Sequence, residues 1–300
     1  MHTRTGIVVA LGLCAVVTLG RCAAATGAEF APLAAGSSSR EARDRVIASV
    51  PLDRMGPAQR EVVEKSFRST TLYRHLPRET VACNAEFLDF LLARPESLVD
   101  VWRVLGISRL TLDPVGPGQW RMADGYGTTG TVSLLYRERH AGGGLLVFHG
   151  RGGYAGPLAP KPLTGSCLLI IRHASAGADA GGRDRQAVQV DAFLDVDGLG
   201  LELVTRTLQP LIVHSAAANF HEICLFVTQF TTAASRNPQG VARLTRRMSR
   251  TDPADRARMA ALACGGTALP DEAGPEADML QTELAARWLP AEQLDGVRPR

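Results

Sequence analysis

Lysine is nearly absent from this chain. Only Lys65 and Lys161 occur, so arginine supplies almost all of the positive charge. Acidic residues balance most of it, and the formal net charge is +3 over 300 residues. A nucleic-acid-binding protein usually carries a clustered basic face, whereas the one basic run, Arg243–Arg250, is typical of a solvated helix face. We therefore expect no nucleic-acid partner.

The motifs of enzyme and cofactor sites are also missing. The chain has no Gly-x-Ser-x-Gly elbow, no dinucleotide fingerprint and no Cys/His spacing for a metal. His221-Glu222 begins like a zinc-protease helix, but Leu225 stands where the second histidine belongs. The glycine-rich stretch Gly150–Gly153 leads into prolines, whereas a phosphate-binding loop leads into a helix N-terminus. We expect no metal and no cofactor, and the catalytic residues remain unknown.

Long apolar runs are scarce too, and the one at the N-terminus indicates a targeting segment. Gly6–Gly20 is uncharged, follows Arg4, and precedes small residues that continue to residue 28. This is the pattern of a secretory signal peptide, and Arg21 ends the run before the ~20 apolar residues of a membrane helix. We therefore predict an exported protein, periplasmic or extracellular, with no transmembrane segment in the mature chain. A lipid-modified Cys22 is an alternative, although arginine before the cysteine departs from the lipoprotein pattern.

Four cysteines would remain after cleavage, and they allow three pairings: Cys83, Cys167, Cys224 and Cys264. Export favours a disulfide, but Cys167 lies in an apolar strand and Cys224 on an apolar helix face. Buried thiols that act as small hydrophobic residues are an equally good reading. The sequence leaves this choice open.

Aromatic residues make up only 5% of the chain, but a hydrophobic content of 45% is enough for a core. Residues 29–56 look like a linker or loosely packed arm, and a helix is predicted from Pro57. A short strand at Thr80–Cys83 should precede two short helices, which begin after Asn84 and at Pro95.

Strand-like segments with period-2 alternation then follow one another without intervening helices. They are Ser108–Asp113, the segment around Trp120 and Met122, Thr131–Arg139, Leu145–His149, Cys167–His173 and Val188–Val196. Loops are predicted at Gly150–Pro162 and Ala174–Gly182. The order predicts an antiparallel meander. Because Asp191, Asp195 and Asp197 lie opposite the apolar face of the last strand, we expect them to face water.

The period changes after residue 198, and a long helix is predicted from Gly200 to about Ser235, kinked at Pro210. A short basic helix follows. Beyond about Leu269 we expect a mostly flexible tail with a short helix near Leu280–Trp288.

The end of this pattern carries a resemblance. Three segments follow one another there: Phe193-Leu-Asp-Val-Asp-Gly-Leu-Gly, Leu208-Gln-Pro-Leu211 and Asn219-Phe-His-Glu222. Together with the element order, they resemble the START-like superfamily, which includes polyketide cyclase/dehydrase-like proteins, over roughly residues 76–235. The resemblance implies a helix-grip fold: an α+β domain whose curved antiparallel sheet of six to seven strands packs on a long C-terminal helix. It also implies a cavity between the sheet and the helix, and it supplies no catalytic motif.

Four regions follow from these observations: a signal peptide at 1–28, a linker and helix at 29–75, a helix-grip domain at 76–240, and a short helix with a tail at 241–300. The expected function is binding of an apolar or amphipathic small molecule. The candidate ligand-binding residues face the predicted cavity: Trp120, Met122, Tyr136, Phe148, His149, Phe220, Ile223 and Val227. The alternatives are a cyclase- or hydrolase-like enzyme that uses His149, His173 or Tyr136 there, and an interaction module with a filled core.

Overall fold

We describe a computed structural model of the chain, covering residues 36–140, 142–155, 162–197, 209–266, 277–289 and 291–294. The predicted signal peptide and Cys22 lie outside these residues, as does the predicted start of the long helix at Gly200. Among the described helices, none is long and apolar enough to span a bilayer.

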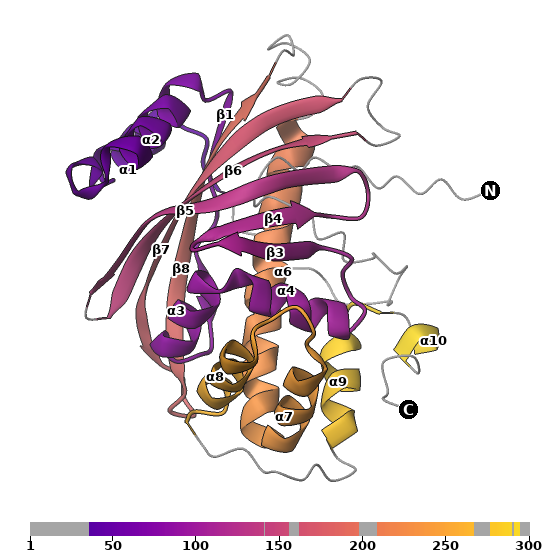
Figure 1. Cartoon of the computed structure of the whole chain (residues 1–300). Coiled ribbons are helices and arrows are strands. Elements are labelled where there is room, and N and C mark those ends of the chain that lie inside the picture. The colour runs from indigo at the N-terminus through magenta and orange to yellow at the C-terminus, as the bar shows by residue number, and fades with distance from the viewer. Residues whose placement is uncertain are drawn as a thin grey trace.

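The fold is α+β and is built on one curved antiparallel sheet of eight strands (Figure 1). The strands are β1 (Leu72–His75), β2 (Glu79–Val81), β3 (Thr111–Gly116), β4 (Gln119–Ala123), β5 (Thr128–His140), β6 (Gly143–Tyr154), β7 (Leu163–Ala178) and β8 (Asp184–Val196). Their order is β1-β8-β7-β6-β5-β4-β3, and β2 also pairs with β8. The predicted meander is therefore correct for β3 to β8, and two short strands extend it at β8.

Helices precede, interrupt and follow the sheet. They are α1 (Arg40–Ala48), the 3-10 turn η1 (Leu52–Arg54), α2 (Pro57–Ser69), α3 (Ala85–Ala93), α4 (Pro95–Val104), α6 (Gln209–Arg236), α7 (Pro238–Arg247), α8 (Pro253–Ala263), α9 (Ala277–Ala285) and α10 (Ala291–Leu294). The predicted start signals are present, because the Asn84 side chain accepts a hydrogen bond from Phe87 N and Pro57 and Pro95 open their helices. Pro210 is the second residue of α6 as described.

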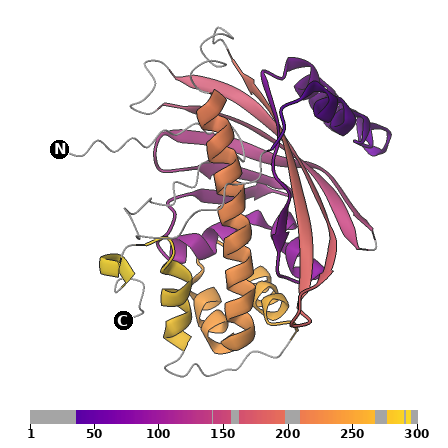
Figure 2. The same cartoon turned by 180° about the vertical axis from the view of Figure 1, so that it is seen from behind.

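The two faces of the sheet have different covers. The inner face, which carries Trp120, Phe148 and Leu169, shares one large hydrophobic cluster with α3, α4 and α6 to α9. The outer face, which carries Val147 and Phe193, forms a smaller cluster with α1 and α2. Figure 2 shows α6 on the inner side of the sheet, with α7, α8 and α9 gathered around its C-terminal half.

Several predicted boundaries were wrong. The supposed linker at 29–56 contains α1, which packs Ala42 and Val46 under the outer face. The loops predicted at Gly150–Pro162 and Ala174–Gly182 begin too early, since β6 runs to Tyr154 and β7 to Ala178. Glycine and alanine carry little strand signal, so these extensions depend on pairing with neighbouring strands.

The described part of the predicted C-terminal tail packs on the domain. The side chains of Leu280, Leu284 and Trp288 are buried in the same cluster as the inner face of the sheet. Arg287 and Trp288 also donate hydrogen bonds to the Glu222 carboxylate on α6, at 2.9–3.1 Å. These contacts join α9 to the long helix.

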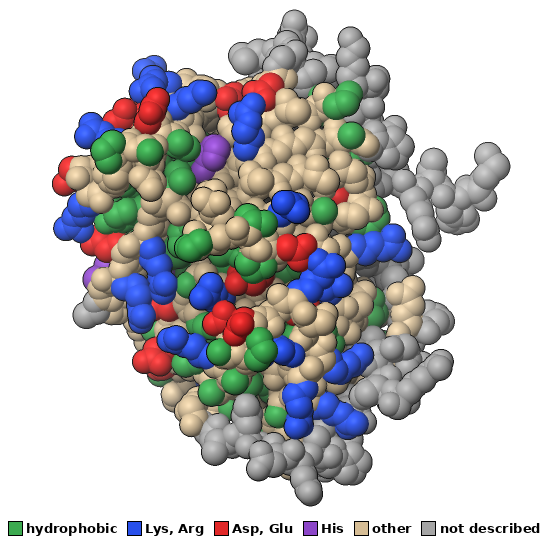
Figure 3. All heavy atoms as spheres, viewed as in Figure 1, with side chains coloured by type: hydrophobic (Ala, Val, Ile, Leu, Met, Phe, Trp, Pro, Cys, Tyr) green, Lys and Arg blue, Asp and Glu red, His purple; other side chains and the backbone are tan. Residues whose placement is uncertain are grey.

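Charge is mixed over the visible surface. Helices α1 and α2 form an arm over the outer face of the sheet. Figure 3 shows basic and acidic side chains interspersed on the face of the molecule that carries this arm. Arg250, from the basic run, forms an ion pair with Asp113 at 2.5 Å. Opposite charges placed this close together favour a solvated surface over a phosphate-binding face.

Candidate functional site

A row of glycines crosses the inner face of the sheet. Gly130 of β5 lies opposite Gly152 of β6, which lies opposite Gly165 of β7. Met122 continues the row on one side and Val196 on the other. Since inward positions alternate with outward ones, β5, β6 and β7 place no side chain of their own on this strip of the inner face. Gly130 and Gly152 are only half-buried, so the strip keeps some accessible surface.

Strands β5 and β6 make close contact along this row. A Cβ added to Gly130 would lie 2.7 Å from the Arg151 carbonyl oxygen, and one added to Gly152 would lie 2.5 Å from that of Thr129. Both contacts are with the backbone of the neighbouring strand, which cannot yield as a side chain does. Glycine at these positions therefore serves close strand pairing and also leaves the inner face bare.

Most candidate residues on the strands of the inner face are fully packed. Trp120 and Phe148 are 2% exposed and Met122 is 3% exposed. The rings of Trp120 and Phe148 lie 6.2 Å apart. Trp120 Nε1 donates a 2.7 Å hydrogen bond to the buried Glu96 carboxylate, so helix α4 covers this end of the sheet. The two short helices thus occupy part of the space that we assigned to a cavity.

The candidates on α6 border this packed region. Val227 is buried, whereas Phe220 and Ile223 are half-buried and pack against the same cluster. The helix is anchored at β2, because Ala82 N donates to Thr228 Oγ1 at 3.1 Å. About two turns away, His221 Nδ1 lies 3.0 Å from Glu79 Oε1. Phe220 and Ile223 therefore sit on a fixed helix and retain accessible apolar surface.

Two polar side chains lie beside the glycine row where β5 begins. Thr128 is two residues before Gly130 on the same face, and Asp124 pairs with it through a 3.1 Å bond from Asp124 N to Thr128 O. Asp124 is 3% exposed and Thr128 is 1% exposed.

Tyr136 and His149 do not belong to the inner face, which corrects two of the candidates. The pairing of β5 with β6 shifts between Leu134 and Tyr136, so Tyr136 packs in the outer cluster. His149 follows Val147 of that cluster by two residues and therefore also points outward. Strict alternation misplaced Tyr136 because a β-bulge reverses the faces beyond it.

His173 does lie on the inner face, in the line of Leu169 and Ile171. Its Nε2 is 3.1 Å from Asp89 Oδ1, and Arg139 Nε is 2.6 Å from the other oxygen of that carboxylate. Burial lowers the pKa of His173, and the nearby Asp89 carboxylate opposes that change. His149 and His173 therefore face opposite sides of the sheet and do not form the pair that their sequence positions suggested.

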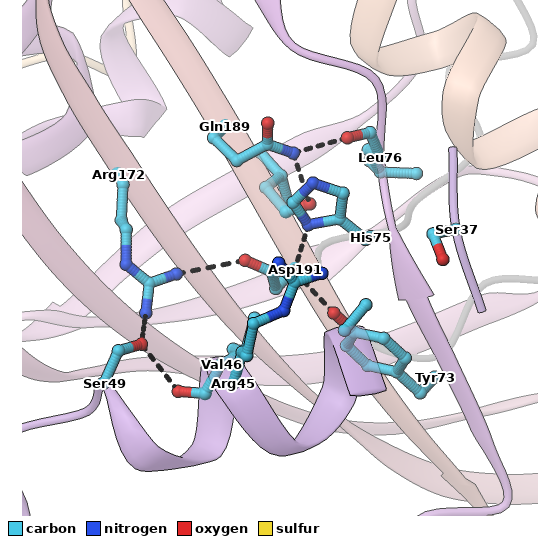
Figure 4. Close-up of polar contacts among 12 residues, drawn as sticks. Ser37, Arg45, Val46, Ser49, Tyr73, His75, Leu76, Arg172, Gln189 and Asp191 are labelled. Atoms are coloured by element: carbon cyan, nitrogen blue, oxygen red, sulfur yellow. Dashed lines mark hydrogen bonds and ion pairs between the residues drawn. The ribbon is translucent and has the colours of Figure 1, made fainter. Parts of the chain in front are cut away.

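The most connected polar cluster lies on the outer face, beneath α1 (Figure 4). Its centre is Asp191, which is completely buried. One oxygen, Oδ1, accepts from Tyr73 Oη at 2.9 Å and lies 2.7 Å from His75 Nδ1. The other oxygen accepts from Arg172 Nη1 at 3.0 Å. The expectation that this aspartate faces water was wrong, because β1 and the arm cover it.

This outer cluster links the arm to the sheet. Arg172 Nη2 donates to Ser49 Oγ at 2.5 Å, and that hydroxyl donates to Val46 O at the end of α1. Burial and the Asp191 carboxylate both raise the pKa of Tyr73, which keeps the phenol protonated as a donor. A buried carboxylate that meets three side chains from β1 and β7 serves to hold these elements together.

Among the described cysteines, Cys83 and Cys224 are buried free thiols, Cys264 is a half-buried free thiol, and Cys167 is buried. Burial raises the pKa of Cys83 to about 12 and that of Cys264 to about 11. These thiols therefore behave as small hydrophobic side chains. Within the described ranges, no group of three His, Cys, Asp or Glu residues is placed to hold a metal ion.

Comparisons with protein-family models and with curated proteins were made. No protein-family model matches the chain, and no curated protein matches it with significant similarity.

Proposed function

We propose that this protein binds an apolar or amphipathic small molecule between the inner face of the sheet and α6. In this proposal the chain is a helix-grip protein of the START-like kind, in which the long helix closes over a curved sheet. The strip at Gly130, Gly152 and Gly165, which we call the bare strip, supports the proposal, because three aligned glycines place no side chain on the inner face and a ligand would occupy that position.

The walls of this space suit an apolar guest. Met122 and Val196 border the glycine row. Phe220 and Ile223 on α6, together with Leu134 on β5, are half-buried members of the adjoining cluster. When a ligand covers accessible apolar side chains, the binding free energy becomes more favourable by about 25 cal/mol for each Å² of apolar surface buried.

The enzyme alternative has less support. The three candidate acids and bases are split between two faces, with His173 on one and Tyr136 and His149 on the other. Acid–base catalysis needs groups within hydrogen-bond reach of one substrate. The interaction-module alternative is favoured by the packed environment of Trp120 and Phe148, and the binding experiment separates it from our proposal.

The test combines native mass spectrometry of protein purified from its own host with titration of a fluorescent apolar probe. We expect a co-purified lipid-like species, or saturable probe binding, in the wild type. Phe220→Ala should weaken probe binding several-fold. The matched control is Leu225→Ala, also half-buried on α6 but outside the cluster. Absence of any bound species and of saturable binding would favour the interaction module.

We also propose that the protein is exported and that its N-terminus is removed between residues 22 and 29. The uncharged run Gly6–Gly20 and the small residues after it support this. Intact mass of the protein from a periplasmic or culture fraction tests the cleavage. A full-length cytoplasmic chain would contradict it.

A further inference from the structure

Two buried polar atoms lie next to the glycine row, Oδ2 of Asp124 and Oγ1 of Thr128. Within the described part of the chain, neither has a hydrogen-bond partner. Thr128 lies opposite Tyr154 at the inward position that follows the Gly130–Gly152 pair. The two atoms therefore lie at one end of the proposed binding space.

The rest of the Asp124 carboxylate is fully used. Its Oδ1 accepts from Tyr126 N at 2.7 Å and from Thr128 N at 2.9 Å, which closes the turn between β4 and β5. The turn therefore explains one oxygen and leaves the other without a role. Buried polar groups are nearly always hydrogen-bonded, and an unpaired buried carboxylate oxygen is costly.

We propose that Asp124 Oδ2 and Thr128 Oγ1 receive the polar end of the bound molecule, and that this end is a hydrogen-bond donor, an amine or an alcohol. The apolar body of the molecule would lie along the bare strip toward Phe220 and Ile223. This inference rests on the proposed function and adds the chemical class of the ligand.

The chemistry of the two atoms determines which head group of a ligand they prefer. An ionised carboxylate only accepts hydrogen bonds, whereas a threonine hydroxyl both donates and accepts. No cationic side chain in the described part of the chain bonds to Asp124 Oδ2. An ammonium group supplies donors and the missing charge, so it should bind more tightly than an alcohol. A carboxylate head would place two negative charges together and is disfavoured.

The test uses four probes with the same twelve-carbon chain: dodecylamine, dodecanol, dodecyl methyl ether and dodecanoate. Each competes with a fluorescent apolar probe on the full protein. In the wild type we expect the amine to bind most tightly, then the alcohol, with the ether and the acid weaker by about 10-fold or more, as expected for one hydrogen bond to a charged group.

Asp124→Asn is the decisive variant. Its side-chain oxygen still accepts from Tyr126 and Thr128, so the turn is kept, but an NH₂ donor replaces Oδ2. The preference for the amine over the ether should fall about 10-fold, and dodecanoate should gain affinity. Thr128→Val should weaken the alcohol without changing the ether. Asp113→Asn, an aspartate of the adjacent strand with 42% side-chain exposure, is the control and should keep the wild-type order.

Three outcomes separate the possibilities. If all four probes bind the wild type equally, or if Asp124→Asn keeps the wild-type order, the head-group site is wrong and the proposed function stands. If no probe binds, the proposed function fails and the head-group site with it. A crystal structure of the amine complex in which only a water contacts Oδ2 and Oγ1 would also overturn the inference.

Discussion

Arg172 and Asp191 form an ion pair across the outer face, with 3.0 Å between Nη1 and Oδ2. They come from adjacent strands, β7 and β8, and occupy diagonal positions in the register. Side-chain exposure is 30% for the guanidinium and 1% for the carboxylate. The arginine therefore compensates a buried charge and reaches the arm through Ser49.

Asp191→Ala should destabilise the protein by roughly 3 kcal/mol, because it leaves Arg172, Tyr73 and His75 without their shared acceptor. Urea unfolding monitored by fluorescence measures this loss. The control is Asp195→Ala on the same face of β8, where the half-exposed carboxylate accepts only from Thr71 Oγ1, at 3.3 Å, among the described contacts. Its cost should stay below about 1 kcal/mol. Equal losses would contradict the central role of Asp191.

Glu96 should make the protein less stable as the pH rises. Burial raises the pKa of this carboxyl above its usual 4.5, so the native state holds the proton more firmly than the unfolded state does. The stabilisation is present below pH 4.5 and is lost as the pH rises through the native pKa. Glu96→Gln keeps an acceptor for Trp120 Nε1 and removes the charge. Its unfolding free energy, relative to the wild type, should therefore increase with pH.

A second variant at the same position separates charge from hydrogen bonding. Glu96→Ala removes the acceptor and leaves the indole nitrogen of Trp120 unpaired, which costs about 2 kcal/mol. Unfolding curves between pH 4 and pH 8 measure both variants. If Glu96→Gln and Glu96→Ala destabilise equally at neutral pH, the bond to Trp120 contributes nothing.

The sequence predicts the sheet well because local signals agree there. Period-2 alternation locates β4, β5 and β8. Because no helical segment is predicted between consecutive strands, the sequence also predicts the antiparallel meander. The polar clusters depend on pairs far apart in the chain. Asp191 meets Tyr73 across 118 residues, and nothing near either residue indicates that β1 will lie beside β8.

The glycine row was missed for a similar reason. Gly130, Gly152 and Gly165 are unremarkable one by one, and only the strand register aligns them. Tyr136 was assigned to the wrong face because period-2 alternation assumes a regular strand, and the bulge after Leu134 breaks that alternation. The polar atoms of Asp124 and Thr128 were missed as well, because their position beside the row follows from the same register.

Two histidines should make the protein less stable in acid. Burial lowers the pKa of both His149 and His173, so the unfolded state binds protons more readily below pH 6.5. Stability is then lost as the pH falls from about 6.5 through the native pKa values. His149→Gln and His173→Gln should each reduce the loss between pH 7 and pH 5, measured by urea unfolding. A variant with the wild-type slope would contradict the assignment for that residue.

Gly152→Ala should destabilise the sheet by about 2 kcal/mol. Its Cβ would lie 2.5 Å from the Thr129 carbonyl oxygen, so β5 and β6 would have to separate. The matched control is Gly116→Ala in β3, where the nearest atom to a new Cβ is Gln119 Oε1 at 3.8 Å, and its change should stay within roughly 0.5 kcal/mol. Thermal unfolding measures both. If Gly152→Ala is as stable as the control, strand pairing does not require glycine at this position. The remaining role for Gly152 would be to leave room for a ligand on the inner face. This stable variant should then lose binding of the apolar probe.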